Sequence, residues 1–225
     1  MPRQLSAGKL AAVSVLTILF VGAVLFVPAG TLDWVEGWLF IAFLVAYVVF
    51  VGSWLAKNNP ELARKRTSFK APKKGWDKII ILSLAIFMFG QIIVAGLNVR
   101  FNWAQMPTAL KAVGFVGIGF TLYVNFLVMR ENTFASRIAE VQKGQKVVST
   151  GPYAIVRHPM YAGFLPFFVG TALALGSWYA LIPGILSAIA LVVRTYQEDT
   201  MLQKELKGYR EYAQKVRYRL LPGVW

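Results

Sequence analysis

Cysteine is absent from this sequence of 225 residues, and histidine occurs once. Without cysteine the chain forms no disulfide, no thiolate metal site and no cysteine nucleophile. A single histidine also leaves too few ligands for a typical zinc site. Acidic residues are scarce as well, because 10 Asp and Glu stand against 24 Lys and Arg, which gives a formal net charge of +14. Any reactive chemistry must therefore use arginines, tyrosines, a few carboxylates and one imidazole.

Several long stretches contain no charged residue, in keeping with a sequence in which 57% of the residues are hydrophobic. The uncharged stretches are 10–28, 38–56, 79–97, 112–129 and 160–193. The first four are long enough to span a bilayer core as helices, and we expect the first to remain as structure rather than to be removed as a signal. The last is too long for one span, and Gly176-Ser177 predicts a turn near its middle. The sequence thus predicts an all-α integral membrane protein with four transmembrane helices plus a C-terminal helical hairpin, giving five to six membrane segments.

The basic residues are unevenly distributed among the connecting loops. The loop 57–78 contains eight Lys and Arg, whereas the loop between the first two spans contains none. By the positive-inside rule, the N-terminus, this loop, the loop 130–158 and the C-terminal tail are all cytoplasmic, in the cell or inner membrane. We interpret the positive charge as orientation and attraction to anionic membrane lipids, and we expect no nucleic-acid partner.

Polar residues collect at both ends of the last apolar run. The sequence before it is GPYAIVRHPMYAG (151–163), and the sequence after it begins RTYQEDTMLQKELKGYREYAQK. Because a hairpin returns its ends to one membrane face, these stretches should be neighbours in space. The side chains brought together are Arg157, His158, Tyr161, Arg194, Glu198 and Asp199. Pro159 suits a first helical turn, so we expect a helix to begin at His158 or Pro159 with its free N–H groups at the membrane boundary.

Each of these residues also has a simpler interpretation. Arg194 and Glu198 are four positions apart and can form an ion pair along one helix. His158 can be a helix cap or an interfacial anchor. Nearby tyrosines can belong to an aromatic belt, namely Tyr153, Tyr161, Tyr209 and Tyr212. The tail from 198 onward is typical of a basic amphipathic helix on the membrane surface. Convergence at one end of one hairpin favours a functional site.

Glycines recur in GFVGIGF, residues 114–120, within the fourth apolar stretch. The spacing does not match a nucleotide-binding loop, and no strand precedes it. Small residues in a membrane helix favour close approach of a neighbouring helix. We therefore expect Gly114, Gly117 and Gly119 to serve helix packing.

The two polar stretches resemble the isoprenylcysteine carboxyl methyltransferase family and, more distantly, the phospholipid methyltransferases grouped with it. The shared pattern is G-x-Y-x-x-x-R-H-P-x-Y-x-G, an apolar hairpin, a carboxylate pair, Gly-Tyr and a closing Leu-Pro. The resemblance covers about residues 125–222. It implies a division into N-terminal transmembrane helices (1–124, with the basic cytoplasmic loop 57–78) and a methyltransferase-like catalytic region (125–225).

The resemblance implies an S-adenosylmethionine cofactor held between the cytoplasmic loop and the start of the hairpin. The implied cofactor-binding residues are Gln145, Lys146, Val147, Val148, Tyr153, His158, Pro159, Met160, Tyr161 and Glu198. Arg194 falls at the position of a substrate-binding arginine, which gives it a catalytic role. No metal is implied. Two departures from the family are Gln145, where eukaryotic members commonly have histidine, and an acidic run reduced to Glu198-Asp199.

The function predicted in this way is S-adenosylmethionine-dependent methyl transfer to a lipophilic small-molecule or lipid acceptor by an integral membrane enzyme. Carboxyl O-methylation of a prenylcysteine-like or other small lipophilic carboxylate is the leading reaction, and N-methylation of a phospholipid or other amine is the alternative. A non-catalytic scaffold or a transporter is a third possibility. A transporter would need polar residues in several spans, but Gln91 and Asn125 are the main exceptions, and no internal repeat is visible. Acceptor identity and oligomeric state stay open at this point.

Overall fold

The computed structural model describes residues 7–67 and 71–225 of the chain. Residues 1–6, which carry the predicted cytoplasmic N-terminus, and Lys70 of the basic loop lie outside the described residues. The helices are α1 (Ala7–Ala29), α2 (Val35–Asn58), α3 (Pro60–Thr67), α4 (Gly75–Phe101), α5 (Thr108–Glu131), the 3-10 helix η1 (Gly151–Ala154), α6 (Pro159–Ala174), α7 (Leu181–Glu205) and α8 (Tyr209–Lys215).

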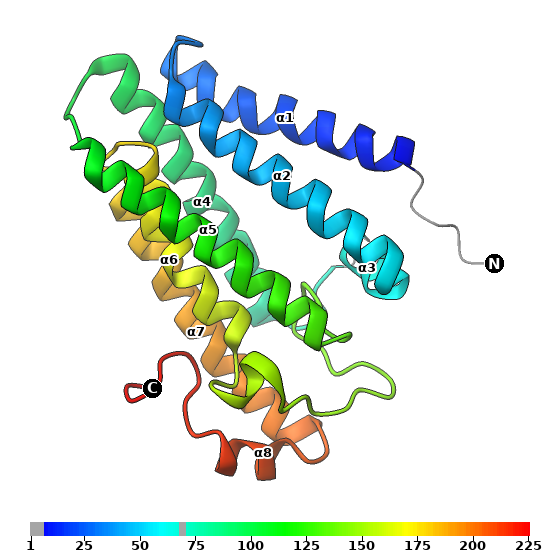
Figure 1. Cartoon of the computed structure of the whole chain (residues 1–225). Coiled ribbons are helices and arrows are strands. Elements are labelled where there is room, and N and C mark those ends of the chain that lie inside the picture. The colour runs from blue at the N-terminus through cyan, green and yellow to red at the C-terminus, as the bar shows by residue number, and fades with distance from the viewer. Residues whose placement is uncertain (1–6, 68–70) are drawn as a thin grey trace.

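The long helices coincide with the uncharged stretches. Within the described residues, α2, α4 and α5 are each long and apolar enough to cross a membrane, and Ile18–Ala29 of α1 and the whole of α6 are shorter apolar helices. Figure 1 shows α1, α2, α4 and α5 as long helices with the α6–α7 pair behind α5. The predicted all-α integral membrane fold is confirmed.

The C-terminal hairpin turns where the sequence predicts. Gly176 has a φ of 77°, a left-handed conformation that suits glycine, and its N–H donates to the carbonyl of Leu173 at 3.0 Å. At 16 residues, α6 is about 24 Å long at 1.5 Å per residue, which is shorter than a hydrocarbon core of roughly 30 Å. Helix α6 alone is therefore shorter than a membrane span, and it packs against α4, α5 and α7.

Small residues let α5 and α6 approach closely. A Cβ atom at position 114 would collide with the backbone of Ala174, and one at position 170 would lie 2.9 Å from the carbonyl oxygen of Gly114. The Thr121 hydroxyl adds a hydrogen bond of 2.6 Å to the carbonyl of Gly163. Close packing is confirmed for Gly114 and Gly117, whereas Gly119 faces the Phe43 ring on α2. The start of α6 is thus fixed against α5.

Two polar residues inside the spans bond to backbone carbonyls, one between helices and one within its own helix. Gln91 of α4 is fully buried and donates to the carbonyl of Phe168 on α6 at 2.5 Å. Asn125 of α5 donates to the carbonyl of Thr121 one turn earlier, at 3.0 Å. Gln91 thus joins α4 to α6, which is the role expected of a polar side chain between membrane helices, although its side-chain oxygen has no hydrogen-bond partner among the described residues. Asn125 bonds within its own helix.

The C-terminal tail is helical in two pieces, which corrects the prediction of one amphipathic helix. Helix α7 continues past the apolar run to Glu205, and Gly208, with a φ of 84°, then turns the chain into the short α8. The turn directs the rings of Tyr209 and Tyr212 inward, where both are buried. The tail therefore packs beneath the hairpin rather than forming a single continuous surface helix.

Candidate functional site

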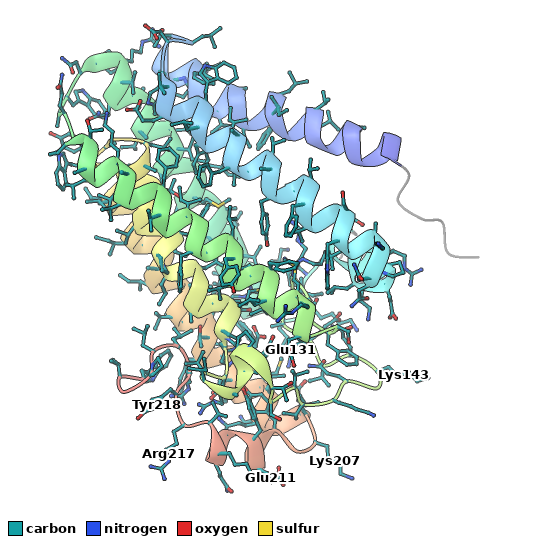
Figure 2. The ribbon with its side chains drawn as sticks, viewed as in Figure 1. Glu131, Lys143, Lys207, Glu211, Arg217 and Tyr218 are labelled. Carbon is teal, nitrogen blue, oxygen red and sulfur yellow. The ribbon has the colours of Figure 1, made fainter. Side chains whose placement is uncertain are left out.

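Charged and polar side chains gather at the end of the bundle where α5 ends, α6 begins and α8 lies. Figure 2 shows Glu131, Lys143, Lys207, Glu211 and Arg217 at this end. A pocket, called here the polar cavity, opens among these segments. It is lined by Asn132, Phe134, Ala135, Ser136, Ile138, Glu140, Gln145, Lys146, Val147, Val148, Tyr153, Arg157, His158, Pro159, Met160, Tyr161, Glu198, Leu202, Leu206, Tyr209 and Tyr212.

All ten residues predicted to bind the cofactor line this one cavity. They come from three places in the chain: the non-helical segment 145–148, the stretch 153–161 across η1 and the start of α6, and Glu198 on α7. The two ends of the hairpin therefore lie close together, as expected from the sequence. Their binding role stays a prediction at this point.

The start of α6 has the predicted form. Pro159 occupies the first helical position and His158 the cap position before it, but the His158 side chain makes no capping hydrogen bond. Its ring instead stacks on the Tyr161 ring, with centroids 5.7 Å apart and planes 3° from parallel. The capping interpretation of His158 is thus wrong for its side chain, which leaves the first-turn N–H groups of α6 without a side-chain cap.

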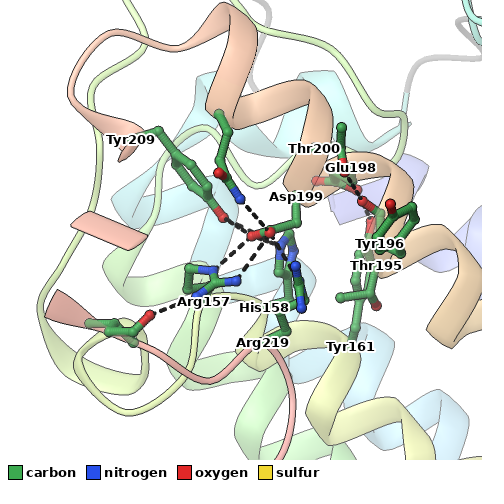
Figure 3. A network of polar contacts seen from close by, with 12 residues as sticks. Arg157, His158, Tyr161, Thr195, Tyr196, Glu198, Asp199, Thr200, Tyr209 and Arg219 are labelled. Carbon is green, nitrogen blue, oxygen red and sulfur yellow. Dashed lines mark hydrogen bonds and ion pairs between the residues drawn. The ribbon is translucent and has the colours of Figure 1, made fainter. Parts of the chain in front are cut away.

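Asp199 is the centre of a buried polar network (Figure 3). Its carboxylate accepts two hydrogen bonds from Arg157, at 2.7 and 3.1 Å, and lies 3.3 Å from Nε2 of His158. Further donors to the same carboxylate are Gln203, Tyr209 and Arg219. Burial alone would raise the pKa of Asp199, but hydrogen bonds from His158 and Arg157 hold it well below its usual range. Asp199 is therefore ionised at neutral pH.

Arg157 joins the start of the hairpin to the C-terminal segment. Its Nη1 donates to the carbonyls of Val216 and Arg217, both at 2.8 Å, and its backbone N–H donates to the carbonyl of Tyr218. The next backbone N–H, that of His158, donates to the carbonyl of Arg219 at 2.9 Å. Arg157 therefore serves mainly to build one side of the cavity, with most of its donors already in use.

Tyr161 stands between the two ends of the hairpin. Its hydroxyl donates to the Glu198 carboxylate at 2.5 Å, and the Arg194 guanidinium lies 5.4 Å from its ring centroid. Figure 3 shows Tyr161 and Glu198 facing each other across the gap between α6 and α7. Tyr161 thus contacts both Arg194 and Glu198. The simpler interpretation from the sequence, a direct ion pair between Arg194 and Glu198, is not found among the ion pairs of the described residues, where Arg194 pairs with Asp77.

Tyr153 is held from two sides. Its hydroxyl accepts a hydrogen bond from the Asn132 amide at 2.8 Å, and its carbonyl accepts one from the Tyr212 hydroxyl at 2.7 Å. Burial raises the pKa of Tyr153 to about 12, against the opposing effect of the Asn132 hydrogen bond. The tyrosines are therefore placed by specific contacts at the cavity and stay protonated at neutral pH.

A second pocket, called here the apolar groove, adjoins the polar cavity. It is lined by Arg66, Pro72, Ile81, Leu84, Ala85, Met88, Ser136, Arg137, Ile138, Met160, Tyr161, Phe164, Phe168, Leu191 and Arg194. Four of these residues, Ser136, Ile138, Met160 and Tyr161, also line the polar cavity. The groove has apolar walls from α4, α6 and α7 and arginines at one end.

Arg194 lies in the apolar groove and is fixed by a residue that the sequence did not reveal. Its Nε donates to the carboxylate of Asp77 at 3.0 Å, and its Nη2 donates to the carbonyl of Arg137 at 2.9 Å. Asp77 is fully buried and also accepts a hydrogen bond from the N–H of Ala139 at 2.8 Å. A carboxylate beside an apolar stretch was the available signal for Asp77, but its partner lies 117 positions away.

Other cavity residues missed from sequence belong to the segment that follows α5. Asn132, Phe134, Ala135, Ser136, Ile138 and Glu140 all line the polar cavity. The segment is non-helical and is held by internal bonds, such as the one from the Gln142 side chain to the carbonyl of Phe134 at 2.8 Å. The Gln145 side chain accepts from the N–H of Gln142 at 2.9 Å. Over the residues that the structure describes, no group of three His, Cys, Asp or Glu side chains is placed to bind a metal.

Comparison with known proteins identifies two similarities. Residues 109–208 match the family model described as phospholipid methyltransferase. A stretch of 69 residues is 35% identical to a protein-S-isoprenylcysteine O-methyltransferase of Schizosaccharomyces pombe. That stretch covers 30% of this chain and 29% of the yeast protein, so the match spans less than a third of the relative's length. The predicted resemblance to these membrane methyltransferases is confirmed, and the family match spans α5, α6 and α7.

Proposed function

We propose that this integral membrane protein is an S-adenosylmethionine-dependent methyltransferase that methylates the carboxylate of a lipophilic acceptor. The observation that carries the proposal is the joining of two pockets of different character. A polar cavity contains all ten predicted cofactor residues, and it shares four wall residues with an apolar groove that contains Arg194. A water-soluble methyl donor and a lipophilic acceptor can meet at that shared wall.

The polar cavity offers groups that fit the parts of S-adenosylmethionine. The first-turn N–H groups of α6 suit a carboxylate, because a helix N-terminus carries partial positive charge. Glu198 can accept hydrogen bonds from an amine or from ribose hydroxyls, and the rings of Tyr153 and Tyr161 can cover an adenine or a sulfonium. When bound, the cofactor supplies an electrophilic methyl group. The protein's contribution is to hold and orient, which is where most of the acceleration of an in-line displacement arises.

The apolar groove favours an acidic acceptor. Its lining includes three arginines, Arg66, Arg137 and Arg194, and no carboxylate. This end of the groove attracts an anion and repels a protonated amine. A carboxylate is already ionised at neutral pH, so its methylation requires no general base. Prenylcysteine-like carboxylates combine such a head group with an apolar chain.

Amine methylation is the alternative favoured by the description of the matching family. An amine acceptor must lose a proton, and Glu198, Asp199 and His158 are the candidate bases. Asp199 is unsuited, because its pKa lies well below the usual range and five side chains already donate to it. Glu198 accepts from Tyr161. The described residues thus support the carboxylate acceptor better than the amine.

The orientation that we propose places both chain termini and the polar cavity on the cytoplasmic side. The basic loop 57–78, the segment 130–158 and the C-terminal tail contain the chain's main clusters of Lys and Arg. Most residues that line the polar cavity belong to the last two of these segments. A cytoplasmic cavity gives the donor direct access from water.

Binding and transfer can be tested on the detergent-purified full chain. Calorimetry should show micromolar S-adenosylmethionine binding in the wild type. The variants His158→Ala and Glu198→Ala should bind at least about tenfold more weakly, because each removes contacts worth about 1.5 kcal/mol or more to a charged ligand. Glu211→Ala, which removes an exposed carboxylate on α8, is the matched control and should bind like the wild type.

The reaction type is read from the product. With methyl-labelled donor and N-acetyl-S-farnesylcysteine, a carboxyl methyl ester should form and release labelled methanol in base. With hexadecylamine as the acceptor, label that is stable to base would instead identify N-methylation. A folded wild type that binds no donor and labels neither acceptor would leave the non-catalytic scaffold as the better account.

A further inference from the structure

Of the three arginines in the apolar groove, Arg66, like Arg137, has no carboxylate partner among the described residues. It lies near the end of α3 and is half-buried. Its Nη1 donates to the backbone carbonyl of Ala135 at 3.0 Å. By contrast, Arg194 in the same groove is paired with Asp77, and Arg157 in the polar cavity is paired with Asp199. Arg66 is thus a partly buried cation with spare hydrogen-bond donors.

Such a placement costs free energy unless an anion completes it. A buried charge without a counter-ion loses its hydration and gains no Coulombic compensation. Burial lowers the pKa of the Arg66 guanidinium, against an opposing effect of Tyr47, and the nearby charge of Arg137 lowers it further. Two like charges held together at the end of an apolar groove therefore indicate a ligand that carries negative charge.

The neighbouring Arg64 shows that this burial is specific. Arg64 lies on the same short helix, is exposed and is not part of the groove lining. The exposed position is the ordinary one for a basic residue that sets membrane orientation or contacts lipid head groups. Arg66 does not occupy such an exposed position, because it lines the apolar groove together with Arg194, Tyr161 and Phe164.

We propose that Arg66 binds the acidic head group of the acceptor together with Arg194, while the acceptor's apolar chain lies along the groove walls formed by Leu84, Met88 and Phe164. This inference rests on the proposed function, since it names a further residue of the same site. Arg66 lies outside residues 109–208, the part that matches the family model. Acceptor specificity in this chain is then set partly by its N-terminal region.

The test compares a charged probe with an uncharged twin of the same shape. Full-length protein in phosphatidylcholine nanodiscs is titrated with N-acetyl-S-farnesylcysteine and with its carboxamide. The wild type should bind the carboxylate at least tenfold more tightly than the carboxamide. Arg66→Gln should weaken carboxylate binding about tenfold and leave the carboxamide and S-adenosylmethionine within about twofold, because only the charge-assisted bonds are lost. Arg64→Gln is the matched control and should leave all three within about twofold.

Several outcomes would overturn the role of Arg66. One is equal weakening of both probes, and another is unchanged carboxylate binding in Arg66→Gln. If Arg66→Gln changes only the response to added phosphatidylglycerol, the residue holds a resident anionic lipid and the proposal is wrong. If Arg66→Gln does not fold, Arg66→Lys is tested in its place. Loss of the planar guanidinium should lower the preference for the carboxylate over the carboxamide about threefold. An unchanged preference would contradict the proposal.

The same samples separate this inference from the proposed function. A wild type that methylates the probe, with Arg66→Gln equal to Arg64→Gln, rejects the role of Arg66 alone. A wild type that binds no S-adenosylmethionine rejects the proposed function. The preference for carboxylate over carboxamide is still measurable in that case, because it is a binding measurement that needs no donor.

Discussion

The Asp199 network and the arginine end of the apolar groove differ in how fully their charges are paired. Asp199 receives hydrogen bonds from five side chains, two of them arginines. The groove holds Arg66, Arg137 and Arg194 near Asp77, which is bonded to Arg194 alone among them. A saturated network has little capacity left for a ligand, so it maintains the architecture. An under-compensated cluster retains capacity for an anion.

Removal of the saturated centre should have the largest effect. Asp199→Ala leaves Arg157 and Arg219 without their carboxylate in a buried setting, and breaking a buried ion pair in this way costs about 3–5 kcal/mol. We expect a large fall in the thermal unfolding temperature of the purified protein, together with loss of donor binding. Glu211→Ala serves as the control, and comparable melting of Asp199→Ala and the wild type would contradict the architectural role.

Acid should reproduce part of this effect in the wild type. The folded-state pKa of Asp199 is depressed, so its stabilising contribution is complete above the unfolded-state value of about 4. It is lost as the pH falls below that value toward the folded-state pKa. The difference in unfolding temperature between wild type and Asp199→Ala should therefore be constant from pH 7 to 5 and should shrink below about pH 4. A difference that shrinks already between pH 7 and 5 would point to another group.

A smaller and more selective effect is expected from Asp77→Asn. The amide keeps a hydrogen-bond acceptor near Arg194 and Ala139 but removes the charge that fixes the guanidinium. Arg194 should lose its orientation, which raises the acceptor KM about tenfold while donor binding stays within about twofold. Asp33→Asn, at an exposed turn between α1 and α2, is the control. Parallel loss of donor and acceptor binding would show that Asp77 is merely structural.

The smallest effect is expected at the boundary between the two regions. Tyr161→Phe keeps the ring beside His158 and Arg194 but removes the hydrogen bond to Glu198. We expect donor affinity to fall about three- to tenfold, because a hydrogen bond to a charged group is worth about 1.5 kcal/mol or somewhat more and Glu198 keeps its charge. The unfolding temperature should change little. Tyr123→Phe, on an exposed face of α5, should match the wild type in both measurements.

Much of the fold follows from local patterns in the sequence. Runs without charge locate the long helices, Gly176 locates the hairpin turn, and Pro159 locates the start of α6. These signals are local because hydrogen bonding within a membrane helix and the conformational freedom of glycine depend on near neighbours. The ten cofactor positions came from the resemblance, and the hairpin topology explains why they converge.

The remaining features depend on how the helices rotate and tilt against one another. Asp77 reaches Arg194 across 117 positions, and hydropathy does not indicate which face of α4 looks toward α7. Arg66 resembles the other basic residues of its loop until α3 is placed against the groove. Gly208 was visible in the sequence, but the helical period on either side of it concealed the break between α7 and α8.

The backbone bonds from Arg157 and His158 to residues 218 and 219 have a consequence for the biogenesis of the protein. The side of the cavity at the start of α6 is completed by the carbonyls of these two residues and by those of Val216 and Arg217, which lie 59 and 60 positions later in the chain than Arg157. Both helices of the hairpin and the segment after α8 must therefore be synthesised before this pocket exists. Until then Arg157 lacks the Asp199 carboxylate and the carbonyls of residues 216 to 218 as hydrogen-bond partners. The polar cavity proposed to bind the donor is therefore completed only late in synthesis, after α7 and the C-terminal segment have been made.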